Sequence, residues 1–137
     1  MNRHRVLVVD DEPGLRRTLE RALRGHHHEV VSVADPNSAY QILGESIFDL
    51  VLLDLRLPQM AGDTFFLAIV RRWPRLLGRV VLMSGDAVEP QPDWPAELAA
   101  CPILHKPFSL ETLLTTVNQV LADLESDSDI LEGNGNP

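Results

Sequence analysis

Four short apolar runs, each followed at once by a polar residue, restrict the fold of this chain most. Continuous apolar runs predict strands that are buried on both faces, as in a parallel sheet. Functional side chains gather just past the carboxyl ends of such strands. The runs are Val6-Leu7-Val8-Val9, Leu50-Val51-Leu52-Leu53, Val80-Val81-Leu82-Met83 and Ile103-Leu104-His105, and they lead into Asp10-Asp11, Asp54, Ser84 and Lys106. These residues predict one crevice that suits a divalent cation and a phosphoryl group.

Strands and helices are expected to alternate along the chain. Glu29–Val33 adds a strand to the four runs, and Asp35-Pro36 is typical of a helix start. Short connections between alternating elements favour right-handed crossovers and a doubly wound α/β sheet. With five parallel strands, the order 2-1-3-4-5 brings Asp10, Asp11 and Asp54 together. The other expected helices cover about 14–24, 63–73, 95–100 and the stretch after Ser109, which we expect to cap the last of them.

Two segments lack the pattern of a regular helix. Pro90, Pro92 and Pro95 interrupt the region of the fourth helix, since proline is tolerated only in a first turn. We expect an extended loop from Gly85 to about Asp93, then a shortened helix. Residues 125–137 are acidic and rich in glycine, which predicts a disordered tail or a linker after a domain of residues 1–124.

Charge and composition exclude several classes of protein. The 137 residues suit one domain, and the net charge of −8 without a basic stripe argues against direct nucleic-acid binding. The lone Cys101 cannot form an internal disulfide, which suits a reducing cytoplasm, and no segment is apolar enough to span a membrane. We interpret His26-His27-His28 as a loop between helix and strand, with metal binding as the less favoured alternative.

The only lysine among twelve basic residues is Lys106, at a predicted strand end. A compact ammonium suits a tight site that holds one phosphoryl oxygen better than a broad guanidinium does. Three clustered carboxylates also repel one another unless a cation is present, and Mg²⁺ suits such hard oxygen ligands.

With these motifs in order, the chain resembles the receiver domain of two-component response regulators over about residues 3–124. The resemblance rests on four motifs, which are Val8-Val9-Asp10-Asp11-Glu12, Asp54-Leu-Arg-Leu-Pro-Gln-Met-Ala-Gly62, Ser84-Gly85 and Lys106-Pro107-Phe108. It implies a flavodoxin-like fold and a signalling module, not an enzyme with a free substrate. Such a module assists its own phosphorylation and dephosphorylation.

The resemblance also implies a role for each site residue. Asp54 would accept a phosphoryl group from the phosphohistidine of a sensor histidine kinase or a phosphotransfer protein. Asp11 would bind Mg²⁺ directly, Asp10 through water, and the Arg56 backbone carbonyl would be a further ligand. Ser84 and Lys106 would contact phosphoryl oxygens, and a cis bond before Pro107 would aim Lys106 inward. The output would be a downstream protein or a fused output domain.

Three features depart from the family pattern. Ile103 stands where an aromatic switch residue is common, so we interpret it as core filler, with activation read from the loop after Ser84. The shortened fourth helix alters a face that commonly binds partners. We interpret Trp94 there as packing on the body, with an anchor for a partner as the alternative. Arg56 and Asp86 are hypothesised to form a salt bridge over the pocket; the alternative is two unrelated solvated charges.

Competing functions differ in what they require of these residues. An aspartate-nucleophile phosphatase would carry a second aspartate two residues after Asp54, where this chain has Arg56. A flavodoxin-like flavin binder is disfavoured because three acids would repel the phosphate of the cofactor. A receiver-like interaction module that works without phosphorylation stays open as the alternative, because of Ile103 and the shortened helix.

Overall fold

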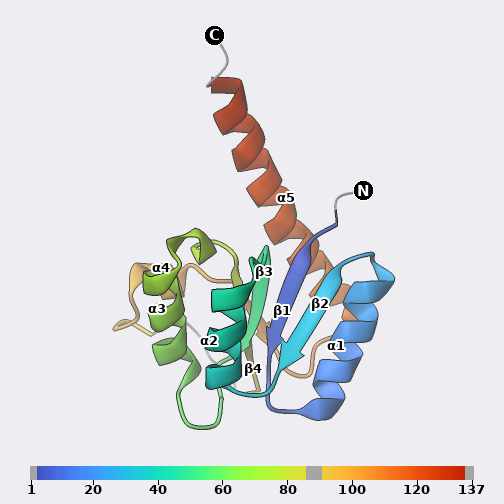
Figure 1. The fold of residues 1–137 in the computed structure, drawn as a ribbon, viewed down its shortest axis with the longest axis vertical. Helices are drawn as coiled ribbons and strands as arrows, with labels where there is room; N and C mark the ends of the chain where they lie inside the picture. Colours follow the sequence, from blue (N-terminus) through green and yellow to red (C-terminus); the bar gives the residue numbers. More distant parts are fainter. Residues whose placement is uncertain (1–2, 86–90, 135–137) are drawn as a thin grey trace.

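The chain folds into a five-stranded parallel sheet with helices on both faces (Figure 1). The computed structural model describes residues 3–85 and 91–134. The strand order β2-β1-β3-β4-β5 and the doubly wound α/β class confirm the prediction. The elements are β1 (Arg5–Val9), α1 (Pro13–Gly25), β2 (Glu29–Val33), α2 (Pro36–Glu45), β3 (Leu50–Asp54), α3 (Gly62–Arg72), the 3-10 turn η1 (Pro74–Leu76), β4 (Val80–Ser84), α4 (Ala96–Ala99), β5 (Ile103–His105) and α5 (Leu110–Asn134).

Alternate residues of the three central strands supply two separate cores. Because successive strand side chains point to opposite faces, Leu7 and Val9 of β1 join the core beneath α2 and α3. Val6 and Val8 join the core beneath α1 and α5. β3 and β4 alternate in the same way and are fully buried. Burial on both faces explains why these strands are continuous apolar runs in the sequence.

Local capping sets where the helices begin. The Asp35 carboxylate accepts the backbone N–H of Ser38 at 2.8 Å, with Pro36 as the first residue of α2. The Ser109 hydroxyl accepts the backbone N–H of Thr112 at 3.0 Å before α5. Both predicted caps are therefore confirmed, since each satisfies an N–H group without an intrahelical partner.

The segment after residue 124, for which we expect a disordered tail or a linker, begins in the structure as a continuation of α5. Helix α5 continues to Asn134 and projects beyond the sheet (Figure 1). The polar composition of the segment suggested disorder, but it contains no glycine or proline between Leu110 and Gly133. Serine and aspartate are modest helix formers and do not break a helix that has already started. The division into a domain and a linker stays a prediction.

The fourth helix is shortened, as expected. α4 covers only Ala96–Ala99 and follows Pro95 directly. The expected loop lies partly outside the described residues, which resume at Gln91. Trp94 and Ile103 are partly buried against the core shared by α2 and α3, so the packing interpretation holds for both. Among the described helices, none is both long and apolar enough to cross a membrane.

Gly62 allows α3 to start against the end of β3. A Cβ atom there would lie 2.5 Å from the Leu55 Cα and 2.6 Å from the Asp54 carbonyl oxygen. Both neighbours are backbone atoms, so no side chain can move aside. The Gly62 N–H donates to the Leu55 carbonyl at 2.9 Å, which closes the loop between β3 and α3.

Gly62→Ala should therefore lower the free energy of unfolding by about 2 kcal/mol, because the added methyl group displaces the backbone beside Asp54. Urea denaturation of the variant measures this loss. Gly44→Ala is the matched control, since its Cβ would meet only a Trp73 side-chain atom at 3.8 Å. Alanine in that helix should leave stability unchanged or raise it by up to about 1 kcal/mol. Equal effects of the two changes would contradict this role of Gly62.

Candidate functional site

Three carboxylates meet where β1 and β3 end side by side. Val9 of β1 pairs with Leu53 of β3, which places Asp10 and Asp54 at neighbouring strand ends. Oxygen atoms of Asp10, Asp11 and Asp54 all lie within 4.8 Å of one another. Asp10 and Asp54 are buried, whereas Asp11 is exposed and faces solvent. The predicted grouping of these three residues is present in the structure.

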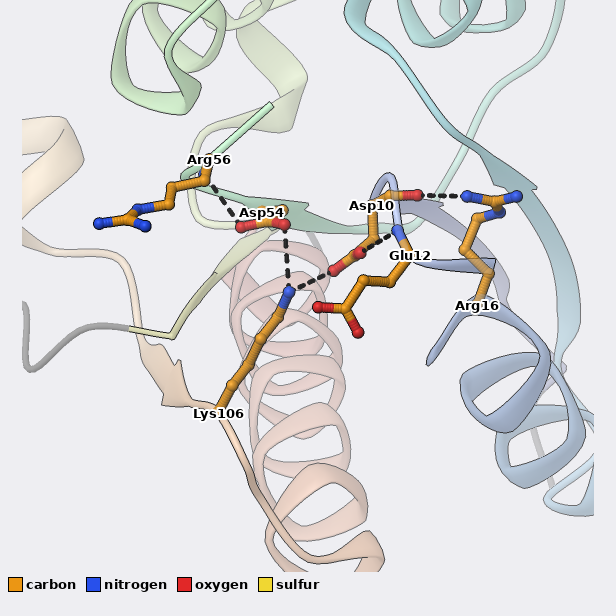
Figure 2. Close-up of polar contacts among 6 residues, drawn as sticks. All are labelled: Asp10, Glu12, Arg16, Asp54, Arg56 and Lys106. Carbon is orange, nitrogen blue, oxygen red and sulfur yellow. Dashed lines mark hydrogen bonds and ion pairs between the residues drawn. The ribbon is translucent and has the colours of Figure 1, made fainter. Parts of the chain in front are cut away.

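The Lys106 ammonium lies between the two buried carboxylates (Figure 2). Its Nζ donates to Asp10 Oδ2 at 2.7 Å and to Asp54 Oδ2 at 3.1 Å. The Lys106 side chain is 16% exposed, so solvent screens these ion pairs only weakly. The expected cis bond between Lys106 and Pro107 is present. The single lysine of the chain thus neutralises part of the charge of the acidic cluster.

Backbone amides bind the remaining oxygens of both buried carboxylates. The Arg56 N–H donates to Asp54 Oδ1 at 2.9 Å, and the Glu12 N–H donates to Asp10 Oδ1 at 2.8 Å. The Arg16 guanidinium donates to the Asp10 backbone carbonyl at 2.7 Å (Figure 2). Each carboxylate is therefore held in a fixed orientation by one amide and one ammonium.

Burial and charge act in opposite directions on the site. Burial raises the pKa of Asp54, and the nearby Asp10 charge adds to this, while the Arg56 amide and Lys106 partly offset it. Burial tends to lower the pKa of Lys106, but its ion pairs with Asp10 and Asp54 outweigh burial and raise it. Lys106 therefore stays charged, and the site attracts a further cation.

Ser84 ends β4 on the other side of Asp54. Asp54 pairs with Met83 in the register of β3 and β4, so Ser84 follows directly beside it. The backbone N–H of Lys106 donates to the Ser84 backbone carbonyl at 2.6 Å, which joins the end of β4 to the residue that carries the ammonium. Ser84 is buried at this strand end, as predicted. Asp54 therefore lies between the acidic strand end of β1 and the strand end of β4 that carries Ser84.

The hypothesised bridge between Arg56 and Asp86 cannot be followed, because Asp86 lies outside the described residues. The Arg56 guanidinium points away from Asp54 and Lys106 (Figure 2). Its backbone N–H, not its side chain, contacts the Asp54 carboxylate. An aspartate-nucleophile phosphatase would have a second aspartate at the position of Arg56. In this chain the Arg56 side chain points away from the pocket instead (Figure 2).

Sequence reasoning missed two groups that hold Asp10. The Glu12 amide and the Arg16 guanidinium fix the turn between β1 and α1. The backbone N–H of residue 12 would be present with almost any side chain, so the residue type does not indicate this contact. Arg16 stands one turn into α1, where an arginine can face solvent as readily as the end of β1, so its position gave no signal either.

Comparison with known proteins matches this geometry to one family. The family model for the response regulator receiver domain matches residues 6–118. The chain belongs to the response regulator receiver domain family. FleR of Pseudomonas aeruginosa, a response regulator protein, is 32% identical over 113 residues, which cover 82% of this chain and 24% of FleR. PilH of the same organism is 28% identical over 118 residues, which cover 86% of this chain and 98% of PilH.

A solved structure agrees with the receiver fold. The chemotaxis response regulator CheY4 of Vibrio cholerae superposes with a TM-score of 0.74 at 28% identity, covering 87% of this chain and 99% of CheY4. This receiver domain thus spans a quarter of one relative and nearly all of another. The resemblance inferred from the four motifs is confirmed, and the chain is a receiver module of two-component signalling.

Lys106→Met should lower the free energy of unfolding by about 3 kcal/mol near neutral pH, because it leaves two buried carboxylates without their ammonium. The raised pKa of Asp54 means that the Asp54 carboxyl group binds its proton more tightly in the folded chain than in the unfolded chain. Lowering the pH protonates the group and removes repulsion, so the loss should be smaller near about pH 5. Urea denaturation in metal-free buffer, near neutral pH and near about pH 5, measures this loss of unfolding free energy.

Asp54→Asn in the Lys106→Met background provides the control. It removes one of the two unpaired charges and should recover part of the lost stability at neutral pH. A loss that is the same at both pH values, with no recovery in the double variant, would show that Lys106 contributes packing and not charge.

Proposed function

We propose that Asp54 is the phosphoacceptor of this receiver module. The position of its carboxylate carries the proposal. Asp54 ends a central strand, one oxygen accepts the Arg56 amide, and the other faces Lys106. Asp10 has one oxygen on the Glu12 amide and is fully buried, and Asp11 lies at the exposed edge. Of the three acids, Asp54 alone both pairs with Lys106 and ends a strand that neighbours β4, the strand that ends in Ser84.

The proposed reaction transfers a phosphoryl group from the phosphohistidine of a sensor histidine kinase or a phosphotransfer protein. An Asp54 carboxylate oxygen forms a bond to phosphorus, the phosphorus–nitrogen bond breaks, and the leaving imidazole takes its proton from solvent. Lys106 and Ser84 bind phosphoryl oxygens, which neutralises and orients the transferred group. The module in this way assists its own phosphorylation and later hydrolysis, and it has no free metabolite as substrate.

The acidic cluster fits Mg²⁺. Three carboxylates within 4.8 Å offer only hard oxygen donors, and the exposed Asp11 gives the ion a path from solvent. Asp11 and Asp54 would hold Mg²⁺ directly, Asp10 through water, and the Arg56 carbonyl would complete the protein ligands. Bound Mg²⁺ supplies positive charge that offsets the phosphoryl oxygens.

Phosphorylation would switch the contacts of the module with a downstream protein or a fused output domain. Ile103 fills the core at the position of the family's aromatic switch, so we place the switch in the segment that follows Ser84. The proposal locates the module in the cytoplasm, where kinase phosphohistidines are available. Direct contact with nucleic acid or membrane is not part of the proposal.

Intact mass after incubation with Mg²⁺ and acetyl phosphate tests the proposal. The parent should gain one phosphoryl group and Asp54→Ala none, because the acceptor oxygen is missing. Asp63→Ala is the matched control. Asp63 is another acid that follows the loop between β3 and α3, and it lies in the first turn of α3. It should gain the group as the parent does.

Two outcomes would overturn the assignment. Phosphorylation of Asp54→Ala to the extent of the parent would place the acceptor elsewhere. A folded parent that gains no phosphoryl group from acetyl phosphate or from a phosphorylated histidine kinase domain would favour the phosphorylation-independent interaction module.

A further inference from the structure

Four histidines gather at the amino-terminal end of the sheet, opposite the acidic site. His4 precedes β1, and His26, His27 and His28 form the connection between α1 and β2. Glu125 of α5 reaches the same place, where its Oε1 lies 3.2 Å from His4 Nε2. Three elements that are distant in the sequence therefore bring imidazoles and a carboxylate together, and the proposed phosphoryl chemistry uses none of them.

The contact with Glu125 decides which nitrogen of His4 is free to bind. A carboxylate beside Nε2 favours the proton on that atom and leaves a lone pair on Nδ1. His4 Nδ1 is buried and has no hydrogen-bond partner among the described residues. Histidines that bind metals commonly donate their second ring N–H to a carboxylate in this way.

His28 presents a second buried nitrogen of the same kind. The residue is 8% exposed, and its Nδ1 also has no hydrogen-bond partner in the described part of the chain. Burial lowers the pKa of His28, and His4, His26 and His27 lower it further against the opposing charge of Asp49. Burial thus favours the neutral imidazole, which is the form that binds metal.

The spacing of these two rings suits one shared ion. Their centroids are 5.7 Å apart, with 53° between the ring planes. Two imidazoles on one tetrahedral Zn²⁺, with zinc–nitrogen bonds of about 2.0–2.1 Å, have centroids about 5 Å apart. The observed ring spacing is thus within about 1 Å of that arrangement.

A hollow lined by both histidines brings a third ligand close to them. Its volume is about 490 Å³, and its lining includes His4, His26, His28 and Glu125. His26 is exposed, so its side chain can turn inward at little cost. Among the described residues, only the aspartate cluster has three ligand atoms already within 4.8 Å. The third histidine ligand must therefore arrive by such a rotation.

We propose that His4 and His28, completed by His26 and oriented by Glu125, form a second cation site that takes a borderline transition metal such as Zn²⁺. Neutral imidazoles select such ions over Mg²⁺, which prefers the oxygen ligands at the opposite end of the sheet. The ion would link the residue before β1 to the turn after α1. Through the contact of His4 with Glu125, it would also be connected to α5.

Calorimetric titration of the tag-free full chain with Zn²⁺, in excess Mg²⁺ to fill the acidic site, tests the proposal. The parent should bind one equivalent. His4→Asn and His28→Asn should each weaken binding by more than about 100-fold, and Glu125→Gln by about tenfold. His27→Asn is the matched control, because His27 lines a different hollow and its φ of 69° is one that asparagine tolerates. It should bind like the parent.

Circular dichroism confirms that each variant is folded, and His4→Asn and Glu125→Gln suffice if His28→Asn is not. Absence of Zn²⁺ binding by the folded parent would overturn the proposal. Equal weakening in His27→Asn and His4→Asn would also overturn it, as would binding that is lost in Asp54→Asn but kept in His4→Asn. None of these results affects the assignment of Asp54.

Discussion

The ion pairs of Lys106 with Asp10 and Asp54 are the constraint on which the rest of the site depends. Two buried carboxylates at adjacent strand ends repel each other, and one ammonium with 2.7 Å and 3.1 Å contacts makes their burial tolerable. The same arrangement keeps the site short of positive charge, with three acids against one lysine. The stability of the strand ends and the attraction of the site for a cation thus have one physical origin.

The parts of the fold that the sequence predicted are those with a local or periodic cause. Apolar runs buried on both faces produce β1, β3 and β4, and Asp35 and Ser109 cap helices through contacts within three residues. The acidic cluster follows from parallel topology, because Asp10 and Asp54 end neighbouring strands. Ile103 and Trp94 were correctly expected to pack on the body because each is a large apolar side chain next to a buried strand or helix.

Features without a local signal could not be predicted. The Glu12 amide donates to Asp10 whatever side chain residue 12 carries, and Arg16 could have faced solvent as readily as the β1–α1 turn. The helical extent of α5 depends on propagation from a packed helix, which composition alone does not reveal. The contact of His4 with Glu125 joins residues at opposite ends of the chain, so it follows only from the folded structure.

A carbon-13 NMR titration of the Asp54 carboxyl group tests the electrostatic account most directly. In metal-free protein, the pKa of Asp54 should lie above its ordinary value, since burial dominates over the Arg56 amide and Lys106. Added Mg²⁺ should lower this pKa, because a second cation favours the ionised form. A pKa of Asp54 at its ordinary value in metal-free protein, unchanged by Mg²⁺, would contradict the account.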